Sequence, residues 1–297
     1  MDFDVIIIGG SYAGLQAAMT LGRALRKVLV IDSGKPCNRQ TPHSHNFLTR
    51  DGETPHAIAS IAREQLQRYH TVKTLFGKVI KGEKQDEGFT VGTGNGETYT
   101  AKKLLFTSGI YDHMPDVAGF AECWGISVIH CPYCHGYEVH SKPTGVVGNG
   151  DLGYEYAKMI SNWSNNITLF TNGPSLFTNE QQAKLTAHHI KIEEAQVTEI
   201  QHKQGYLTHL IAGGNAFEFN AVYWRPAFKQ HCDVPQLMGC QLTDAGYLKI
   251  DELLHTSIPG VYAAGDCTTQ MRSVASAVNS GAMAGVLLNK ELNDEGF

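Results

Sequence analysis

The chain reads Asp4-Val5-Ile6-Ile7-Ile8-Gly9-Gly10-Ser11-Tyr12-Ala13-Gly14 near its start, and this stretch predicts its fold. The apolar residues before the glycines are typical of a buried strand, and the small residues from Leu15 to Leu25 recur at helical spacing. A second β-branched run, Lys27 to Ile31, ends in Asp32, eighteen residues beyond Gly14. In dinucleotide-binding domains such glycines let the backbone approach a pyrophosphate, and the acid accepts a hydrogen bond from a ribose hydroxyl. The order of these parts therefore predicts a dinucleotide site.

One position departs from the G-x-G-x-x-G pattern of such turns. Ser11 stands where the middle glycine belongs. Serine is the smallest substitute that carries a side chain, so we expect the ligand to approach the turn. The alternative is a glycine-rich turn that joins two core strands without binding anything.

A second turn of the same kind, Gly148-Asn149-Gly150-Asp151-Leu152-Gly153, has all three glycines. It follows an expected strand at Thr144 to Val147 and precedes an expected helix from Tyr154 to Trp163 and a strand at Asn166 to Phe170. The residues after that strand, Thr171 to Leu176, include no acid for the ribose of NADH and no arginine for the 2′-phosphate of NADPH. Two interpretations stay open: this half of the chain binds a nicotinamide dinucleotide, or it keeps the fold without the ligand.

The remaining segments complete an α/β pattern. We expect an amphipathic helix from Thr54 to Tyr69, strands from Val72 to Thr93 and a buried strand from Lys103 to Phe106. The turn at Asp112 to Pro115 resembles a linker, and Lys191 to Arg225 is typical of mostly antiparallel strands. The two glycine turns thus predict an α/β fold with two Rossmann-like dinucleotide-binding domains of three layers (ββα).

The motif with the most chemical content is Cys131-Pro132-Tyr133-Cys134-His135-Gly136-Tyr137-Glu138. A Cys-x-x-Cys is found in zinc sites, in covalent haem attachment, where a histidine follows as it does here, and in redox dithiols. Zinc requires a second pair, which the other five cysteines do not provide: Cys37, Cys123, Cys232, Cys240 and Cys267. Haem attachment requires export, and Met1 to Asp4 shows no export pattern. We therefore favour a redox dithiol formed by Cys131 and Cys134.

Composition narrows the possible partners and the compartment. The net charge is -5, and the 24 lysines and arginines are scattered, so we expect neither a nucleic acid nor an anionic membrane as partner. No apolar run is long enough to span a membrane, and seven cysteines, an odd number, favour a reducing compartment, so we predict a cytoplasmic protein. The 14 histidines, including His43 and His45, form no metal-ligand pattern; we expect no metal site and solvated surface histidines.

Near the end of the chain, Thr256-Ser257-Ile258-Pro259-Gly260-Val261-Tyr262-Ala263-Ala264-Gly265-Asp266 predicts a strand that ends in Gly-Asp. Together with both glycine turns and the Cys-x-x-Cys, it resembles the low-molecular-weight thioredoxin reductases, class II pyridine nucleotide-disulfide oxidoreductases, over essentially the whole chain. The resemblance implies a homodimer with a discontinuous FAD domain, 1–112 plus 245–297, into which a redox domain, 113–244, is inserted. It also implies FAD bound by Gly9, Gly10, Ser11, Ala13, Gly14, Asp32, Asn46, Gly265 and Asp266, with Arg272, Ser273 and Val274 near the isoalloxazine.

Two departures from that family make the chain more similar to the gliotoxin-type dithiol oxidases and their bacterial relatives. His135 follows the second cysteine, where thioredoxin reductases have an aspartate, and Thr171 to Leu176 lacks their basic motif. Those oxidases resemble thioredoxin reductases in fold, but they form disulfides and pass electrons from FAD to oxygen.

The resemblance implies an FAD-dependent dithiol/disulfide oxidoreductase in which Cys134 faces the flavin and Cys131 exchanges with the substrate. His135 is the candidate acid or base, since imidazole titrates near neutrality, and Glu138 is a candidate to orient it; the alternative is a histidine that only caps the turn. We expect the substrate to be a thioredoxin-like protein or a small-molecule dithiol or disulfide, and oxygen is a candidate electron acceptor. Two other functions stay open: an NAD(P)H-dependent thioredoxin-disulfide reductase and a non-catalytic flavin/dithiol sensor. Pro226 to Gln241 carries no motif that identifies the substrate.

Overall fold

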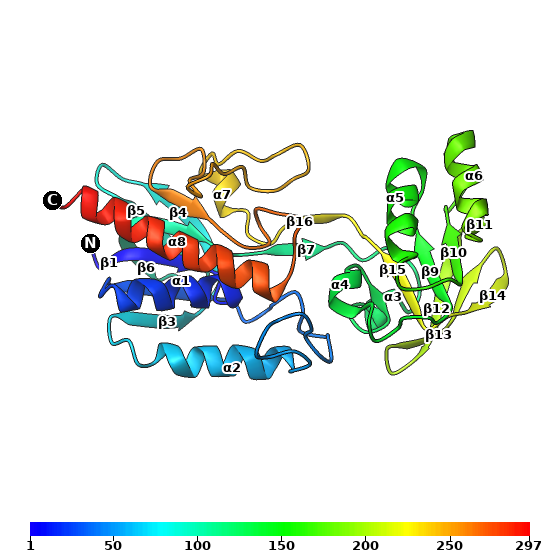
Figure 1. The fold of residues 1–297 in the computed structure, drawn as a ribbon. Helices are drawn as coiled ribbons and strands as arrows, with labels where there is room; N and C mark the ends of the chain where they lie inside the picture. The colour runs from blue at the N-terminus through cyan, green and yellow to red at the C-terminus, as the bar shows by residue number, and fades with distance from the viewer. The chain divides into compact units, whose positions relative to one another are not determined.

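The computed structural model describes all 297 residues, and its contacts divide the chain into two compact units (Figure 1). The first unit comprises residues 1–39, 47–111 and 228–297, and the second comprises residues 40–46 and 112–227. The second unit is inserted into the first. Two boundaries differ from the sequence-based expectation: residues 40–46 group with the second unit, and residues 228–244 group with the first.

The first unit is built on a seven-stranded sheet of order β3-β2-β1-β6-β5-β4, in which β17 also pairs with β6. Neighbours of β1 are parallel, with Ile8 opposite both Ile31 of β2 and Phe106 of β6, whereas β4, β5 and the start of β6 are antiparallel. The strands are β1 (Phe3–Ile8), β2 (Val28–Asp32), β3 (Val72–Phe76), β4 (Val79–Lys84), β5 (Phe89–Thr93), β6 (Thr98–Phe106) and β17 (Val261–Ala263).

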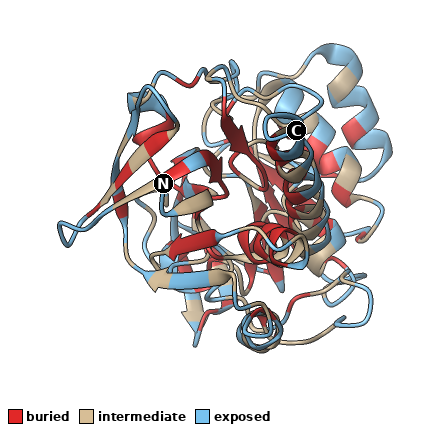
Figure 2. Ribbon diagram, turned by 90° about the vertical axis from the view of Figure 1, so that its left-hand side faces the viewer, coloured by how far each residue is buried: buried red, intermediate tan, exposed pale blue.

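Both faces of this sheet are buried, as the continuous apolar run of β1 predicts. Successive strand side chains point to opposite faces. Ile6 and Ile8 therefore join one core cluster, with residues of β5 and β6, while Val5 and Ile7 join another, formed with helices α1 (Tyr12–Arg23) and α8 (Val274–Asp294). Figure 2 shows buried residues concentrated along these strands. The result is a layered arrangement with helices on one side and antiparallel strands on the other.

Small residues allow α1 and α8 to pack closely. A side-chain carbon placed at Gly281 of α8 would lie 2.2 Å from the carbonyl oxygen of Ala13 in α1. One placed at Gly285 would lie 2.6 Å from Thr20. Another helix of the unit, α2 (Pro55–Leu66), begins after Thr54, whose hydroxyl accepts a hydrogen bond from the N–H of Ala57.

The C-terminal turns of α8 are held by a cluster of charged side chains. The ammonium group of Lys103, a buried residue of β6, bonds to the carboxylates of both Glu291 and Glu295. Glu291 also contacts the hydroxyl of Tyr262 and lies 2.9 Å from His255, measured from Oε2 to Nε2. Since a buried ammonium needs opposite charge nearby, this cluster fixes the helix end to the sheet.

Residues 228–244 belong to the first unit because three of their side chains are buried in its core. Cys232, Val234 and Cys240 pack in the same cluster as Ile6 and Ile8. Their spacing follows neither a strand nor a helix period, since only α7 (Val234–Leu237) and β16 (Phe228–Gln230) are regular, so sequence periodicity could not place them. β16 pairs with β7 (Ile110–Asp112).

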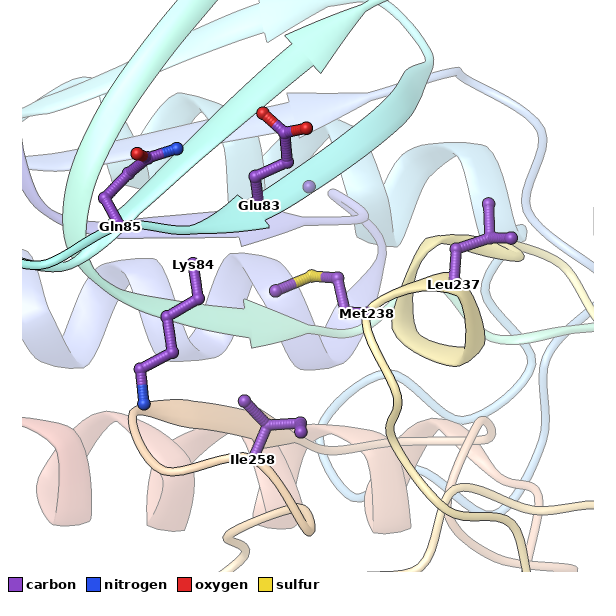
Figure 3. A pocket seen from close by; sticks show the side chains of 7 residues that line it. Glu83, Lys84, Gln85, Leu237, Met238 and Ile258 are labelled. Atoms are coloured by element: carbon purple, nitrogen blue, oxygen red, sulfur yellow. The ribbon is translucent and has the colours of Figure 1, made fainter.

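A pocket of about 540 Å³ lies between this segment and the antiparallel strands of the first unit (Figure 3). Its lining includes Leu237 and Met238 from the α7 segment, Ile258, and the end of β4 with the residue that follows it. None of the predicted site residues lines it.

The second unit has a five-stranded parallel sheet of order β11-β10-β9-β15-β8 and a separate antiparallel sheet β12-β13-β14. We expected mostly antiparallel strands from Lys191 to Arg225. This is only partly right, because Ala221–Trp224 (β15) pairs in parallel with β9. The strands are β8 (Val128–Ile129), β9 (Thr144–Val147), β10 (Ile167–Phe170), β11 (Lys191–Glu193), β12 (Val197–Lys203), β13 (Tyr206–Ala212), β14 (Asn215–Glu218) and β15 (Ala221–Trp224). The helices are α3 (Phe120–Cys123), α4 (Pro132–His135), α5 (Gly150–Ile160) and α6 (Asn179–Ala187). Across the whole chain, no helix combines the length and the apolar character needed to cross a membrane.

Candidate active site

Cys131 and Cys134 form a disulfide, with their Cα atoms 5.3 Å apart. Cys131 directly precedes α4, a single helical turn that Pro132 begins, and Cys134 lies within it. The turn is closed by a hydrogen bond of 2.7 Å from the N–H of Gly136 to the carbonyl oxygen of Pro132. A side chain at Gly136 would lie 2.4 Å from that oxygen and 2.8 Å from Trp163, so the glycine is required for the close packing. The local sequence therefore holds both sulfur atoms at disulfide distance.

Two tyrosines beside the disulfide are exposed. Tyr133, between the cysteines, is 65% exposed, and its ring meets Trp163 edge-on at 5.3 Å. Tyr137 is 77% exposed and stacks on His140. The turn that carries Cys131 and Cys134, called the redox turn below, thus presents aromatic surface to solvent, where it can contact a substrate.

His135 is half-buried and close to a second imidazole. Burial, followed by the charge of His45, lowers the pKa of His135 to about 4. The ring is therefore neutral at pH 7 while the disulfide is intact. A neutral imidazole can accept a proton, and a thiolate formed beside it would favour its protonation.

The side chain that Glu138 contacts is His45 and not His135. Oε1 of Glu138 lies 3.5 Å from Nδ1 of His45, and the rings of His45 and His135 are perpendicular with centroids 6.3 Å apart. The side chain of His45 is only 21% exposed, so the expectation of a solvated surface histidine is wrong at this position. Sequence reasoning missed His45 because 90 residues separate it from His135, and no spacing pattern joins the two.

The first glycine turn leaves the N-terminus of α1 open to an anion. The side chain of Ser11 caps no backbone N–H, and the first turn of α1 contains no acidic residue. A side chain at Gly9 would lie 2.4 Å from the carbonyl oxygen of Thr107, and one at Gly14 would lie 1.9 Å from that of Gly9. The cradle thus requires glycine, and its N–H groups face no competing carboxylate of the helix. These residues fit the pyrophosphate of FAD.

Other predicted flavin residues gather around the same turn. A side-chain carbon at Gly10 would lie 2.8 Å from Cβ of Asp32, which places the acid beside the glycines. Gly265 has a φ of 80°, and a side chain there would lie 3.0 Å from Ala13.

The remaining predicted flavin residues lie at the start of α8 and in the segment 40–46. Arg272 lies 3.8 Å from Asp266, measured from Nε to Oδ2. Ser273 caps α8, whose first residue is Val274. Asn46 lies in the segment that groups with the second unit, so its role in flavin binding stays a prediction.

Hydrogen bonds from the side chain of Asn149 connect the second glycine turn to the loop that follows β10. Asn149 Oδ1 accepts hydrogen bonds of 2.8 Å from the N–H groups of Gly150 and Leu176, and its Nδ2 donates to the carbonyl oxygens of Thr171 and Pro174. The amide group of this one side chain therefore joins the turn to the loop after β10.

The charges around the second turn are negative. Asp151 lies in the first turn of α5, where a phosphate would otherwise meet the helix N-terminus, and Glu194 accepts a hydrogen bond from the N–H of Ser175. A carboxylate at this place disfavours a phosphate. The two glycine turns, alike in sequence, thus differ in their suitability for a dinucleotide.

Comparison with known proteins gives matches over nearly the whole chain. The family model described as pyridine nucleotide-disulphide oxidoreductase matches residues 3–281. Thioredoxin reductase sirT of Leptosphaeria maculans is 30% identical, covering 97% of this chain and 93% of the relative. Thioredoxin reductase tcpT of Claviceps purpurea is also 30% identical, covering 97% and 94%. Among solved structures, an oxidoreductase from Agrobacterium tumefaciens has 35% identity and a TM-score of 0.92, covering 99% of each chain. A putative thioredoxin reductase TrxB from Bacillus anthracis has 29% identity and a TM-score of 0.94, covering 99% and 100%.

Proposed function

The chain belongs to the pyridine nucleotide-disulphide oxidoreductase family, and on that premise we propose that it oxidises dithiols through the Cys131–Cys134 disulfide without a nicotinamide. It is a thioredoxin reductase-like flavin disulfide oxidoreductase.

In the proposed reaction, one thiol of the substrate attacks Cys131 and breaks the enzyme disulfide. The second thiol then attacks the mixed disulfide, so the substrate leaves as a disulfide and the enzyme holds two reduced cysteines. Two electrons and two protons pass from the substrate to the protein. Overall, a dithiol and dioxygen give a disulfide and hydrogen peroxide, with dioxygen as the proposed oxidant.

The open N-terminus of α1, Asp32 and the Gly265-Asp266 turn are the proposed binding residues for FAD. When bound, FAD carries the electron pair between the cysteines and the terminal acceptor. His135 accepts the proton of the attacking thiol, and its neutral ring is suited to that role.

The observation that carries the proposal is the closed second glycine turn. Asn149 uses its amide to bind the loop after β10, and Asp151 places a carboxylate at the helix start. The loop from Thr171 to Leu176 also offers no basic side chain for a 2′-phosphate. All three features oppose a dinucleotide.

One other function has support of its own. The relatives are named thioredoxin reductases, and the second turn keeps all three glycines, which favours an NAD(P)H-dependent thioredoxin-disulfide reductase. In that case the loop that Asn149 holds has to open for the nicotinamide.

The two functions are separated by anaerobic visible spectra of the flavin-loaded protein. We expect dithiothreitol to bleach the flavin band and NADPH and NADH to leave it unchanged. The double variant Cys131→Ser/Cys134→Ser is the control, and dithiothreitol should not bleach it rapidly. Rapid bleaching of the native protein by either nicotinamide would reject the proposal in favour of the reductase.

We also propose that the protein is a cytoplasmic homodimer. Met283 and Val286, three residues apart on α8, are 46% and 59% exposed and form an apolar face suited to a second copy. Thiols at Cys123, Cys232, Cys240 and Cys267 suit a reducing compartment. Light scattering after size exclusion measures the mass, and a monomer at micromolar concentration would contradict the dimer.

A further inference from the structure

The redox turn of the second unit has a second imidazole that the proposed reaction does not yet use. His45 lies on segment 40–46, which is attached to the unit by a hydrogen bond of 2.9 Å from Nε2 of Gln40 to the carbonyl oxygen of Ala121. Ser44, just before it, is buried. The segment thus holds the His45 ring in place, at right angles to that of His135 and 6.3 Å from it.

We propose that His45, paired with Glu138, is a positioning residue that orients His135 and controls its charge beside the Cys131–Cys134 disulfide. This inference rests on the proposed function, because it assigns the proton of the thiol exchange. The pair therefore adds two side chains to the machinery of the site, one of them from a distant part of the chain.

The charge of His45 acts on His135 through space. Protonated His45 forms an ion pair with Glu138, at 3.5 Å, and its positive charge opposes a second positive charge on the neighbouring ring. Burial and this charge together lower the pKa of His135 to about 4. His135 thus stays neutral until a thiolate forms beside it.

The first exchange step can then be written with its proton. The S–H bond of the substrate breaks, its sulfur bonds to Sγ of Cys131, and the bond between Cys131 and Cys134 breaks. Cys134 leaves as a thiolate, and the proton of the substrate passes to His135. In the second step the remaining substrate thiol displaces Cys131, which takes up that thiol's proton. Two protons and two electrons have then reached the protein.

The other titratable groups that face the pair are few. His43 lies on the same segment, with its ring centroid 6.4 Å from that of His45. Tyr223 of β15 is buried, and burial and the charge of Glu138 both raise the pKa of its hydroxyl. Tyr223 is therefore neutral over the range in which His135 titrates.

The direct test is an NMR titration of the oxidised flavin-loaded protein labelled with ¹³C-histidine, with the His135 signal assigned by its loss in His135→Ala. We expect a midpoint near pH 4 in the native protein. His45→Gln should raise it by roughly one pH unit, because it removes a positive charge. Glu138→Gln should lower it, because it removes the negative charge that partly offsets His45. His45→Lys, which keeps a positive charge beside Glu138, should leave it near the native value. The matched control is His140→Gln, which removes an exposed histidine that stacks on Tyr137, and it should cause no shift.

A second readout is the pH dependence of anaerobic flavin bleaching by dithiothreitol, whose acidic limb should move upward in His45→Gln and downward in Glu138→Gln. Native midpoints in both His45→Gln and Glu138→Gln would overturn the inference. If His45→Gln detaches its segment, Glu138→Gln, which leaves the ring in place, decides the question. If dithiothreitol bleaches no protein, the native one included, the proposed function fails, whereas the NMR titration still tests His45.

Discussion

Gly281 provides a quantitative test of the contact between α1 and α8. A methyl group at this position would lie 2.2 Å from the carbonyl oxygen of Ala13, and ordinary contact begins at 3.4 Å, so the helices have to separate by about 1.2 Å. In a helix without neighbours, replacing glycine by alanine stabilises by about 1 kcal/mol. Overpacking costs about 1 to 3 kcal/mol, and here the clash is with backbone, which cannot rotate away. Since a clash with backbone places the cost near the upper end of that range, we expect Gly281→Ala to lower the free energy of unfolding by about 2 kcal/mol.

The same change should weaken FAD binding, because Ala13 belongs to the proposed flavin turn. We expect a loss of about tenfold, or about 1.4 kcal/mol. Urea unfolding of the flavin-free protein measures the first effect, and fluorescence titration with FAD measures the second. Asn279→Ala, at an exposed position of the same helix, is the matched control and should be neutral or slightly stabilising. Native stability and native FAD affinity in Gly281→Ala would refute the reasoning.

Three further predictions concern other parts of the chain. His135→Ala should slow anaerobic bleaching by dithiothreitol about a hundredfold while the flavin content stays native, and unchanged bleaching would remove His135 from the reaction. Asn149→Ala should cost about 1 kcal/mol in urea unfolding, because it releases the loop after β10, but bleaching by dithiothreitol should persist; loss of bleaching would show that the second glycine turn takes part in the reaction. Burial raises the pKa of Glu291, but hydrogen bonds to Lys103, Tyr262 and His255 outweigh burial and lower that pKa to about 2. The ionised carboxylate therefore stabilises the fold fully above its ordinary pKa of 4.5, and this stabilisation is lost as the pH falls towards 2. The pKa of His255 is raised, because its hydrogen bonds to Asp251 and Glu291 outweigh burial. Protonated His255 therefore stabilises the fold fully below its ordinary pKa of 6.5, and this stabilisation falls as the pH rises. Glu291→Gln should therefore cost about 2 kcal/mol at about pH 5.5 and less at about pH 8.5, and an equal loss at both would contradict this assignment.

The parts of the fold that the sequence predicted are those specified by neighbouring residues. The apolar run of β1, the glycines after it and Asp32 lie within one strand–turn–helix–strand unit, and the Cys-x-x-Cys spacing already requires a tight turn. Each depends on local backbone geometry, which sequence periodicity reports.

Other features depend on contacts between distant residues, and the sequence did not predict them. The core position of Cys232 and Val234 follows from packing against β1, over 200 residues away. Glu138 is close to His135 in the sequence, but its side chain contacts His45, 93 residues away. The two glycine turns, which share the first and last glycine of the pattern, also differ in the structure, because the side chain of Asn149 hydrogen-bonds across one of them.

The grouping of residues 40–46 with the second unit has a practical consequence for protein engineering. The polypeptide passes from one unit to the other four times, at 39/40, 46/47, 111/112 and 227/228. A fragment cut at 112 and 227 would keep both cysteines and His135 but lose His45. A chimaera that moves this redox unit onto a related scaffold must therefore carry two pieces of sequence, one of them only seven residues long.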